Sequence, residues 1–532
     1  MANTTLVDCS LRDGHQSLLA TRMSTEQCLR VLPLLAEVGY PIMELWGGAT
    51  LDASLRFTGD DPFDRLDRFR DCLDQVGRPV QIRSLCRGQN LFGYTPYPDN
   101  VVCEFLKEAI RTATPKRFDL ASAENAFSRD ELAANAHRVR IFDALNDHRN
   151  LITAIMATKT FNGHAEAALS YTVSPVHDLD HFLRFARACV DAGADSLAIK
   201  DMAGLLHPAD AWELIEALQS EFPAVELTLH AHCTNGLATA SYVVGLLTGV
   251  DYLDTCHGPM AHGTSQPPVE VIRYFAEEIG HDLGLVFTPN AEIDAKLREI
   301  RAELGEVDKD ADHVGKPWPA VPTPAIRQAV REAVRLLKLR DRASCDAAIQ
   351  IIQQQLFLPQ GYPPIDGSQL ESQIPGGMVS NLHHQLKEQG QLEQLPAILE
   401  EVTRVRKAAG YLPLVTPTSQ IVGTQAAFNV IQGRPYRIVS QQFRDVIMGH
   451  YGKLPGPVDP EVVKAVCGDK PRFRGRPADR VPDADLEKVF RSSEGLIKNH
   501  RDLLLVLLFP VPAKKFLEQR AAAAGQLVAE PA

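Results

Sequence analysis

Short apolar runs alternate with longer helix-period segments through the first half of the chain. The runs are rich in aliphatic and β-branched residues and lie at 5–7, 42–45, 80–85, 117–120, 151–157, 196–199, 226–229 and 252–254. Eight predicted strands that alternate with helices over about 280 residues indicate an α/β fold, a parallel (β/α)8 TIM barrel. An open doubly wound sheet is the structural alternative, but no Gly-x-Gly-x-x-Gly motif follows the first run.

Two of the intervening segments carry boundary signals as well as helical spacing. Residues 25–38 follow Ser24, which is a plausible helix N-cap. Residues 181–192 end at Gly193, where we expect the glycine that terminates a helix. The pattern therefore predicts helices over both segments.

The hydrophobic pattern changes beyond the predicted barrel, which we assign to residues 1–290. Residues 291–365 predict a helical connector interrupted by the proline cluster 316–324, because proline cannot occupy a helix interior. Residues 366–517 predict a mostly helical C-terminal domain, with a Pro-Gly-Gly turn at 375–377 and amphipathic sequence over 383–407. Residues 518–532, including the Ala/Gly-rich stretch 521–532, are expected to form a disordered tail.

Charge and composition restrict the partners and the compartment. The 532-residue chain has a net charge of −12 and a pI near 5.8, which argues against nucleic acid or an anionic membrane as the main partner. The first residues lack the pattern of a secretory signal, and the apolar run 503–509 is too short to span a bilayer. Ten scattered cysteines without a Cys-x-x-Cys pair fit reduced thiols. We expect a soluble cytoplasmic protein.

Polar and charged residues gather where the predicted strands end, which is where TIM barrels place their chemistry. The segments are 12–16 after the first strand, 46–50 after the second, 87–90 after the third and 200–204 after the sixth. His230 and His232 lie at the end of the seventh strand and project from the same face, because they are two residues apart. Few of these groups are explained by folding alone.

A candidate metal centre combines residues from three of these strand ends. Asp13, His230 and His232 supply one carboxylate and two imidazoles, a set that suits Zn²⁺, Mn²⁺ or Co²⁺. An ammonium at Lys200 would repel the cation, so Lys200 is a carbamylated fourth ligand, a catalytic amine or an ion-pair partner. Asp13 has two other possible roles, a salt bridge to Arg12 or a helix N-cap.

Several long motifs resemble the pyruvate carboxylase-type carboxyltransferase family. That family includes the carboxyltransferase domain of pyruvate carboxylase, the α subunit of oxaloacetate decarboxylase and the large metal-binding subunit of transcarboxylase. The opening signature is Arg12-Asp-Gly-His-Gln-Ser-Leu-Leu-Ala-Thr-Arg22. Further matches, in family order, are Trp46-Gly-Gly-Ala-Thr50, Arg87-Gly-Gln-Asn90, Ile199-Lys-Asp-Met-Ala-Gly204, His230-x-His232, Ile374-Pro-Gly-Gly-Met-x-Ser-Asn-Leu382, the segment 413–427 and Pro455-Gly-Pro-Val-Asp-Pro460.

The resemblance implies a role for each matching residue. It implies a metal held by Asp13, a carbamylated Lys200, His230 and His232. It also implies that Arg87 binds the carboxylate of a 2-oxo acid, with Arg12 and Gln16 as further substrate-binding residues and Gln16 at the keto oxygen. Asp52 and Tyr94 match positions that line the reaction pocket, and Ser380 matches a hydroxyl that passes a proton between biotin and the substrate methyl group. From the residues alone, Arg87 as a structural ion pair and Ser380 as a helix N-cap stay open.

The implied activity moves a carboxyl group between carboxybiotin and a 2-oxo acid, most simply pyruvate and oxaloacetate, through an enolpyruvate intermediate. We find neither an upstream ATP-grasp region nor an Ala-Met-Lys-Met-like biotinylation motif. We therefore expect a separate biotin carboxyl carrier protein, together with a biotin carboxylase or a second carboxyltransferase subunit, and a homodimer of this chain.

Two other functions compete with this one. A biotin-independent lyase or synthase of the hydroxymethylglutaryl-CoA lyase group would share the Arg-Asp and His-x-His features, and a non-catalytic assembly subunit would fit a degraded pocket. Two features depart from the family, namely the Cys233-Thr-Asn-Gly236 loop and a connector that looks unusually long at 310–362. Both leave the substrate open.

Overall fold

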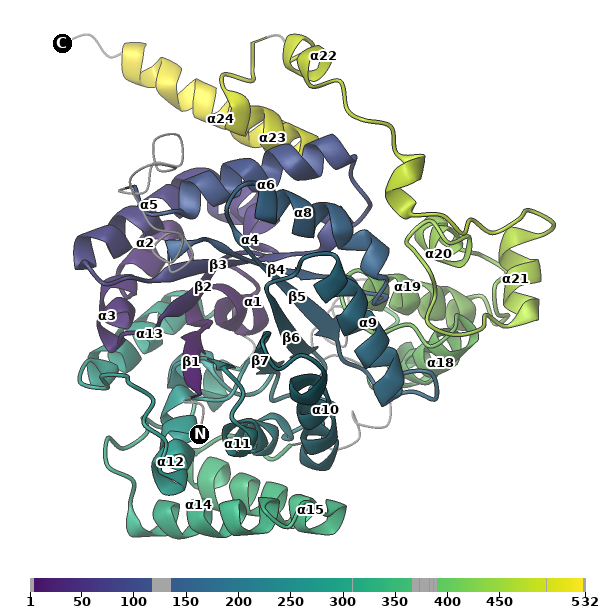
Figure 1. The fold of residues 1–532 in the computed structure, drawn as a ribbon. Coiled ribbons are helices and arrows are strands. Elements are labelled where there is room, and N and C mark those ends of the chain that lie inside the picture. Colours follow the sequence, from purple (N-terminus) through teal and green to yellow (C-terminus); the bar gives the residue numbers. More distant parts are fainter. Residues whose placement is uncertain are drawn as a thin grey trace.

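The computed structural model describes residues 4–116, 135–308, 310–365, 373, 382, 386, 390–493 and 495–529. Eight parallel strands close into a barrel in sequence order. Figure 1 shows this barrel with helices around it. They are β1 (Thr5–Asp8), β2 (Ile42–Gly47), β3 (Gln81–Cys86), β4 (Arg138–Phe142), β5 (His164–Ser170), β6 (Ser196–Asp201), β7 (Glu226–Ala231) and β8 (Tyr252–Thr255). The predicted TIM barrel is confirmed.

The fourth and fifth predicted strands were placed wrongly. The run 117–120 lies outside the described residues, and the fourth strand is β4. The run 151–157 falls almost entirely in helix α8 (Ile152–Thr160), and the fifth strand is β5. The hydrophobic pattern did not reveal β4, because Arg138 and Arg140 alternate with its apolar residues and point into the barrel. A short run of apolar residues such as 151–157 reads equally well as a strand or as a helix.

The helix signals at Ser24 and Gly193 are confirmed, with one break. The hydroxyl of Ser24 accepts a hydrogen bond from Gln27 N and forms a capping box at the start of α2 (Thr25–Leu29). A second helix, α3 (Leu32–Val38), then begins with Pro33 in its first turn, so 25–38 is two helices rather than one. Helix α9 (Leu179–Asp191) ends before Gly193, whose φ of 101° only glycine adopts easily.

The connector helices pack on the barrel rather than away from it. Helix α13 (Asn290–Glu303) lies near α3, and α14 (Pro324–Leu337) and α15 (Arg342–Ile351) cover α10 (Pro208–Glu221), α11 (Ala238–Thr248) and α12 (Val269–Ile279) (Figure 1). Buried Ile326, Leu337 and Phe357 join the core that surrounds the barrel. The proline cluster forms the loop before α14, as predicted.

The C-terminal helices divide between two cores. Helices α18 (Leu395–Ala408), α19 (Thr418–Ile431), α20 (Gln441–Ile447) and α21 (Pro460–Cys467) share a separate apolar core. After α22 (Leu486–Arg491), the helices α23 (His500–Leu508) and α24 (Pro510–Ala529) return to the barrel, where Leu504 and Phe516 are buried (Figure 1). We expected residues 518–532 to be disordered, but helix α24 continues through residues 518–529. This stretch is rich in alanine, which is the strongest helix former. None of the helices in the described ranges is long and apolar enough to cross a membrane.

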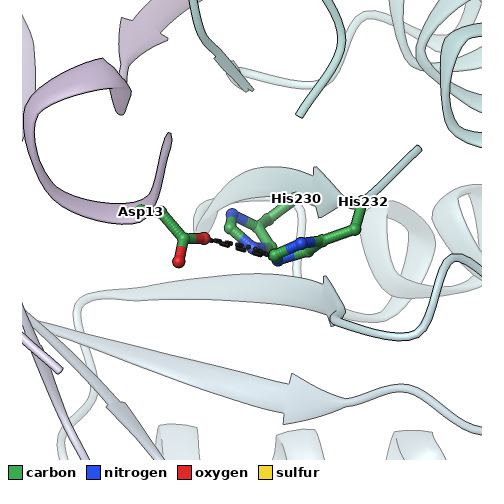
Figure 2. Close-up of side chains that lie close together, drawn as sticks. All are labelled: Asp13, His230 and His232. Atoms are coloured by element: carbon green, nitrogen blue, oxygen red, sulfur yellow. Dashed lines mark hydrogen bonds and ion pairs between the residues drawn. The ribbon is translucent and has the colours of Figure 1, made fainter. Parts of the chain in front are cut away.

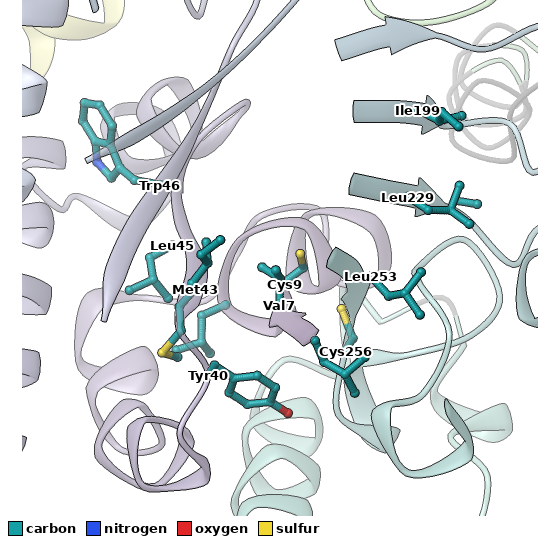
Figure 3. Close-up of a cluster of buried hydrophobic side chains, with 14 of the residues drawn as sticks. Val7, Cys9, Tyr40, Met43, Leu45, Trp46, Ile199, Leu229, Leu253 and Cys256 are labelled. Atoms are coloured by element: carbon teal, nitrogen blue, oxygen red, sulfur yellow. The ribbon is translucent and has the colours of Figure 1, made fainter. Parts of the chain in front are cut away.

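Side-chain alternation along the strands sets up the interior of the barrel. Ile199, Leu229 and Leu253 are paired across β6, β7 and β8 and are buried against the surrounding helices (Figure 3). The next residue on each strand points the opposite way, because successive side chains alternate between faces. Lys200 and His230 are therefore register partners inside the barrel.

Candidate active site and metal centre

Four side chains from three strand ends converge at the carboxyl end of the barrel. Asp13 lies in the turn η1 (Ser10–Gly14) that follows β1, Lys200 and His230 lie on β6 and β7, and His232 follows β7 directly. Lys200 Nζ is 2.8 Å from His230 Nε2, and the Nε2 atoms of His230 and His232 are 3.1 Å apart. Asp13 Oδ2 lies 3.3 Å from His230 Nε2 and 3.4 Å from His232 Nε2 (Figure 2).

The outward-facing nitrogens of the two imidazoles are committed to other partners. His230 Nδ1 donates to Asp254 Oδ2 at 2.8 Å, and His232 Nδ1 donates to the carbonyl of Thr264 at 2.5 Å. Since a neutral imidazole has one N–H, both Nε2 atoms present lone pairs to the space between them. Such second partners orient the histidines of metal centres.

This donor set fits a divalent cation. Two imidazole lone pairs and the Asp13 oxygen lie within 4.8 Å of one another, and all three residues are buried. Without a cation, two lone pairs 3.1 Å apart repel each other, and His230 gains little from a proton because burial and Lys200 lower its pKa. Two imidazoles and a carboxylate suit Zn²⁺, Mn²⁺ or Co²⁺.

An ion-pair network fills the barrel beside this site, where most TIM barrels have aliphatic side chains. Three guanidinium groups meet four carboxylates, all of them buried: Arg12, Arg83 and Arg140 with Asp13, Glu44, Glu166 and Asp254. Leaving Lys200 aside, these pairs carry a surplus of one negative charge, which either the Lys200 ammonium or a metal ion can balance. Cys9, Glu44 and Asp254 also lie close together, but the arginines already neutralise these two carboxylates.

Asp13 and Lys200 are both shifted by burial and by their neighbours. Burial raises the pKa of Asp13, but Arg12 and Lys200 outweigh burial and hold it well below its usual range. Asp13 Oδ1 pairs with Arg12 at 2.7 Å while Oδ2 faces the imidazoles, so the salt bridge and the ligand position coexist. Burial lowers the pKa of Lys200 to about 8.

Arg87 follows β3 and is 7% exposed. Its Nη1 donates to the carbonyls of Phe92 and Gly93 at 2.5 and 3.3 Å, and its guanidinium lies 5.5 Å from the ring centre of Tyr94. No carboxylate of the described residues lies within 4.0 Å of it, so the structural ion pair that we considered does not form there. Buried charges are normally paired, which marks Arg87 as a site for an anion.

The other predicted residues have distinct surroundings. Gln16 Oε1 accepts from Ala49 N at 2.9 Å, which leaves its amide N–H groups as donors. Asp52 is paired with Arg56 at 2.6 Å. Arg12 is fully buried and is bound to Glu44 and Asp13. Ser380 lies outside the described residues.

An apolar wall lies next to Lys200, because Ala198 precedes it by two residues on the same face of β6. Leu85, Phe142 and Ala198 from three strands form a small buried cluster with Val415, which comes from the segment before α19, and Met202 packs against it. The segment before α19 therefore packs directly against side chains of the barrel strands. Buried Arg406 on α18 strengthens this contact, because it donates to Thr172 Oγ1 at 3.0 Å after β5.

Sequence reasoning missed three residues that hold the ligands in place. Asp254 and Thr264 fix the two histidines, and the amide of Gln266 donates to Asp13 Oδ2 at 2.8 Å. All three lie on or after β8, a strand end that we had not searched. Cys233, by contrast, is not among the converging ligands of the described residues, and burial raises the pKa of its thiol.

Two family models match the chain. The model described as "Conserved carboxylase domain" matches residues 370–531, and the model described as "HMGL-like" matches residues 109–289. The first match covers the helical C-terminal part and the second covers much of the barrel.

Similar proteins extend over the whole chain. One pyruvate carboxylase subunit of Methanocaldococcus jannaschii is 39% identical over 99% of this chain and 78% of that protein. The methylmalonyl-CoA carboxyltransferase 5S subunit of Propionibacterium freudenreichii is 35% identical (97% and 88%), and the 2-oxoglutarate carboxylase large subunit of Hydrogenobacter thermophilus is 30% identical (99% and 70%). The carboxyl transferase domain of Rhizobium etli pyruvate carboxylase, solved with pyruvate and biocytin, has a TM-score of 0.74 at 25% identity, covering 98% of this chain and 78% of that one. The chain therefore belongs to the pyruvate carboxylase-type family of biotin-dependent carboxyltransferases and is an enzyme of this kind.

Proposed function

We propose that this protein is a carboxyltransferase subunit that moves a carboxyl group between carboxybiotin, carried by another protein, and pyruvate. The observation that carries the proposal is the buried guanidinium of Arg87, which has no acidic partner among the described residues. It sits at the same mouth of the barrel as a set of ligands suited to a cation. A 2-oxo acid has a carboxylate that Arg87 can bind and a keto oxygen that a cation at the ligand set can contact.

Each residue has a defined task in this scheme. Arg87 holds the substrate carboxylate and orients the keto acid. The amide of Gln16 donates to the keto oxygen, on which negative charge develops when a methyl proton leaves. A divalent cation bound by Asp13, His230 and His232 would polarise the same oxygen. The resulting enolpyruvate attacks CO₂ released from carboxybiotin, and oxaloacetate forms.

Proton transfer and pocket shape complete the scheme. The hydroxyl of Ser380 passes the methyl proton to biotin, and Asp52 and Tyr94 line the pocket. Arg12 supports Asp13 rather than touching the substrate, because its contacts are with two buried carboxylates.

We further propose that Lys200 is carbamylated when the metal is bound. Its amine lies 2.8 Å from His230 Nε2, which is a ligand position. An ammonium there would oppose a divalent cation. A carbamate adds a second negative charge to the surplus of the buried network, and a divalent cation then neutralises both. The balance of buried charge supports the four-ligand set.

The apolar wall supports pyruvate over a larger 2-oxo acid. A substrate such as 2-oxoglutarate, named in one of the relatives, carries a second carboxylate that needs a second cation. Beside the metal ligands, the described wall is built from Leu85, Phe142, Ala198, Val415 and Met202, which supply none. We therefore favour the pyruvate and oxaloacetate pair.

The names of the relatives support a proposal for the partners, and the cysteines support one for the compartment. Three of the relatives are named as subunits, which supports a multisubunit biotin enzyme. We propose a biotin carboxyl carrier protein and a biotin carboxylase or second carboxyltransferase subunit as partners, and a homodimer of this chain. All ten cysteines are free, which supports a reducing, cytoplasmic location.

The decisive experiment follows pyruvate formation from oxaloacetate with and without free biotin or a biotinylated carrier. Decarboxylation stimulated by biotin supports the proposal. The HMGL-like match keeps a lyase as the second candidate, and cleavage of an acyl-CoA substrate without biotin would replace the first function by that one. Metal-replete protein without any turnover would instead favour an assembly subunit.

A further inference from the structure

The loop that follows β8 joins two of the metal-ligand segments. Its Thr264 carbonyl accepts from His232 Nδ1, and its Gln266 amide lies 2.8 Å from Asp13 Oδ2 and 3.2 Å from His232 Nε2. Two further hydrogen bonds tie the same segments, because Ser265 O accepts from Cys233 N and Thr264 Oγ1 donates to Ser17 O. The loop therefore sets the relative position of Asp13 and His232.

This loop is held from the outside by the connector. The buried ring of His262, in the middle of the loop, stacks on Phe357 with centroids 4.2 Å apart and planes inclined by 17°. Tyr362 meets the same ring edge-on at 4.6 Å. Trp318 packs against both aromatic residues, at 5.7 Å from Phe357 and 6.1 Å from Tyr362. We call Trp318, Phe357 and Tyr362 the aromatic clamp.

Further contacts tie the connector to the first half of the loop. Tyr362 Oη donates to Gly258 O at 3.4 Å, and Arg301 Nη1 donates to Pro259 O at 2.6 Å. The clamp itself is closed by a hydrogen bond from Lys316 N to Gln360 O at 2.7 Å. Residues that are distant in sequence therefore contact the loop at several points along its length.

The backbone conformation of His262 requires support from the surrounding residues. Its φ is 68°, in the left-handed region that costs a non-glycine residue free energy. Its imidazole is buried and Nδ1 has no hydrogen-bond partner among the described residues, so the ring serves as a packing surface. A strained turn keeps its shape only where surrounding contacts hold it, and here those contacts come from the clamp.

We propose that the aromatic clamp is a positioning device for the metal centre, acting through His262 and Gln266. This assigns a role to the connector segment 310–362. The inference rests on the proposed metal site but on no particular substrate. Loosening the clamp lets Gln266 move away from the ligands, and the metal is then released faster.

The test uses full-length protein loaded with Co²⁺, whose release to an excess of EDTA is followed by the loss of its d–d absorption. His262→Leu removes the ring stack, and His262→Phe keeps a ring at the same strained backbone position. Gln266→Leu removes the amide directly. Tyr436→Leu is the matched control, because Tyr436 stacks on Phe443 at 5.9 Å in the separate C-terminal core.

We expect Gln266→Leu to release Co²⁺ about 10- to 100-fold faster, the usual effect of losing a partner of a metal ligand. His262→Leu should release it about tenfold faster, with His262→Phe and Tyr436→Leu close to the unchanged protein. The double variant His262→Leu/Gln266→Leu should be no faster than Gln266→Leu alone, because both act through one contact.

Release of Co²⁺ from His262→Leu at the unchanged rate would overturn the clamp and leave the carboxyltransferase function standing. A lowered thermal midpoint of the metal-free variant alongside that unchanged rate would show that the clamp has a purely structural role. Failure of the unmodified protein to bind Co²⁺, Zn²⁺ or Mn²⁺ would overturn the metal centre itself. If His262→Leu does not fold, Phe357→Leu gives the same comparison from the connector side.

Discussion

His230 and Asp254 are joined by a hydrogen bond of 2.8 Å between Nδ1 and Oδ2 on adjacent strands β7 and β8. Asp254 is also paired with Arg83 at 2.7 Å and with Arg140. One carboxylate therefore fixes the tautomer of a metal ligand and anchors it to the buried ion-pair network. The orientation of His230 depends on residues that lie on the far side of the barrel interior.

Replacing Asp254 by Asn should weaken both metal binding and folding. The amide cannot neutralise Arg83 and Arg140, and breaking a buried ion pair typically costs about 3–5 kcal/mol. Metal affinity should fall about 10- to 100-fold, as is usual when a ligand loses its orienting partner. Chelator competition and urea unfolding measure the two effects. Glu226→Gln is the control, since Glu226 pairs with Arg138 but is 39% exposed in its side chain, and an equal loss there would contradict the argument.

Lys200→Ala and His230→Ala should each lose the bound metal. The two side chains approach to 2.8 Å at the convergence point, so each deletion removes a proposed ligand. Elemental analysis of the purified variants measures the metal content. Lys159→Ala, which removes an exposed lysine paired with Asp195, should keep its metal. Full retention of metal in both site variants would rule out the ligand set.

Arg87→Lys should weaken the use of the 2-oxo acid without affecting the metal. A lysine keeps the charge but loses the planar fork that grips a carboxylate through two hydrogen bonds. We expect a fall in kcat/KM of about 10- to 100-fold, which corresponds to one charged hydrogen bond. Steady-state kinetics of oxaloacetate decarboxylation measure it, with Arg184→Lys as a comparison at an exposed arginine on α9. An unchanged kcat/KM would remove Arg87 from substrate binding.

Ser380→Ala should keep the fold and the metal but lose most of its turnover. The hydroxyl is proposed to pass the proton between the substrate methyl group and biotin, and an alanine cannot. Ser380→Thr, which keeps a hydroxyl, should retain activity and serves as the control. The measurement is biotin-stimulated decarboxylation alongside metal content. Near-normal turnover of the alanine variant would exclude the proton relay.

Asp143 should make the protein less stable as the pH rises from 4 to 7. Burial, reinforced by the charge of Asp147, raises the pKa of this carboxyl from 3.8 to about 7. Between these two values the native protein keeps a proton that the unfolded chain has lost, so stability is highest at the acidic end and falls as pH rises through 7. The expected change is a few kcal/mol, at about 1.4 kcal/mol per unit.

Asp143→Asn should remove that contribution. The variant cannot ionise, and its side-chain oxygen can still accept from Leu145 N, as Asp143 Oδ2 does at 2.9 Å. The free energy of unfolding in urea, measured at several pH values, should therefore fall less steeply with pH than in the unmodified protein. Asp479→Asn, at an exposed carboxyl, should leave the slope unchanged. Parallel curves for Asp143→Asn and the unmodified protein would contradict a raised pKa.

The local pattern of apolar and polar residues was sufficient to predict the barrel and to pair two of the four candidate metal ligands. Six of the eight strands were predicted at their correct positions. Their outward-facing side chains pack under the helices and are aliphatic, and such runs can be recognised from the sequence alone. His230 and His232 were paired because two residues of separation on a strand fixes a common face. These relationships depend on neighbours in the chain, and periodicity encodes them.

Only the tertiary structure decided what surrounds the ligands. Register places Lys200 beside His230, and closure of the barrel brings Asp13, from the first strand, against residues of the seventh. The charged interior hid β4, whose arginines broke its apolar pattern, and it also supplied Asp254 as the anchor of His230. The burial of Arg87 without a carboxylate partner among the described residues depends on residues far apart in the chain, and so does the packing of Phe357 on His262. These long-range contacts follow from how strands and helices pack against one another. A local repeat of apolar and polar positions does not encode them.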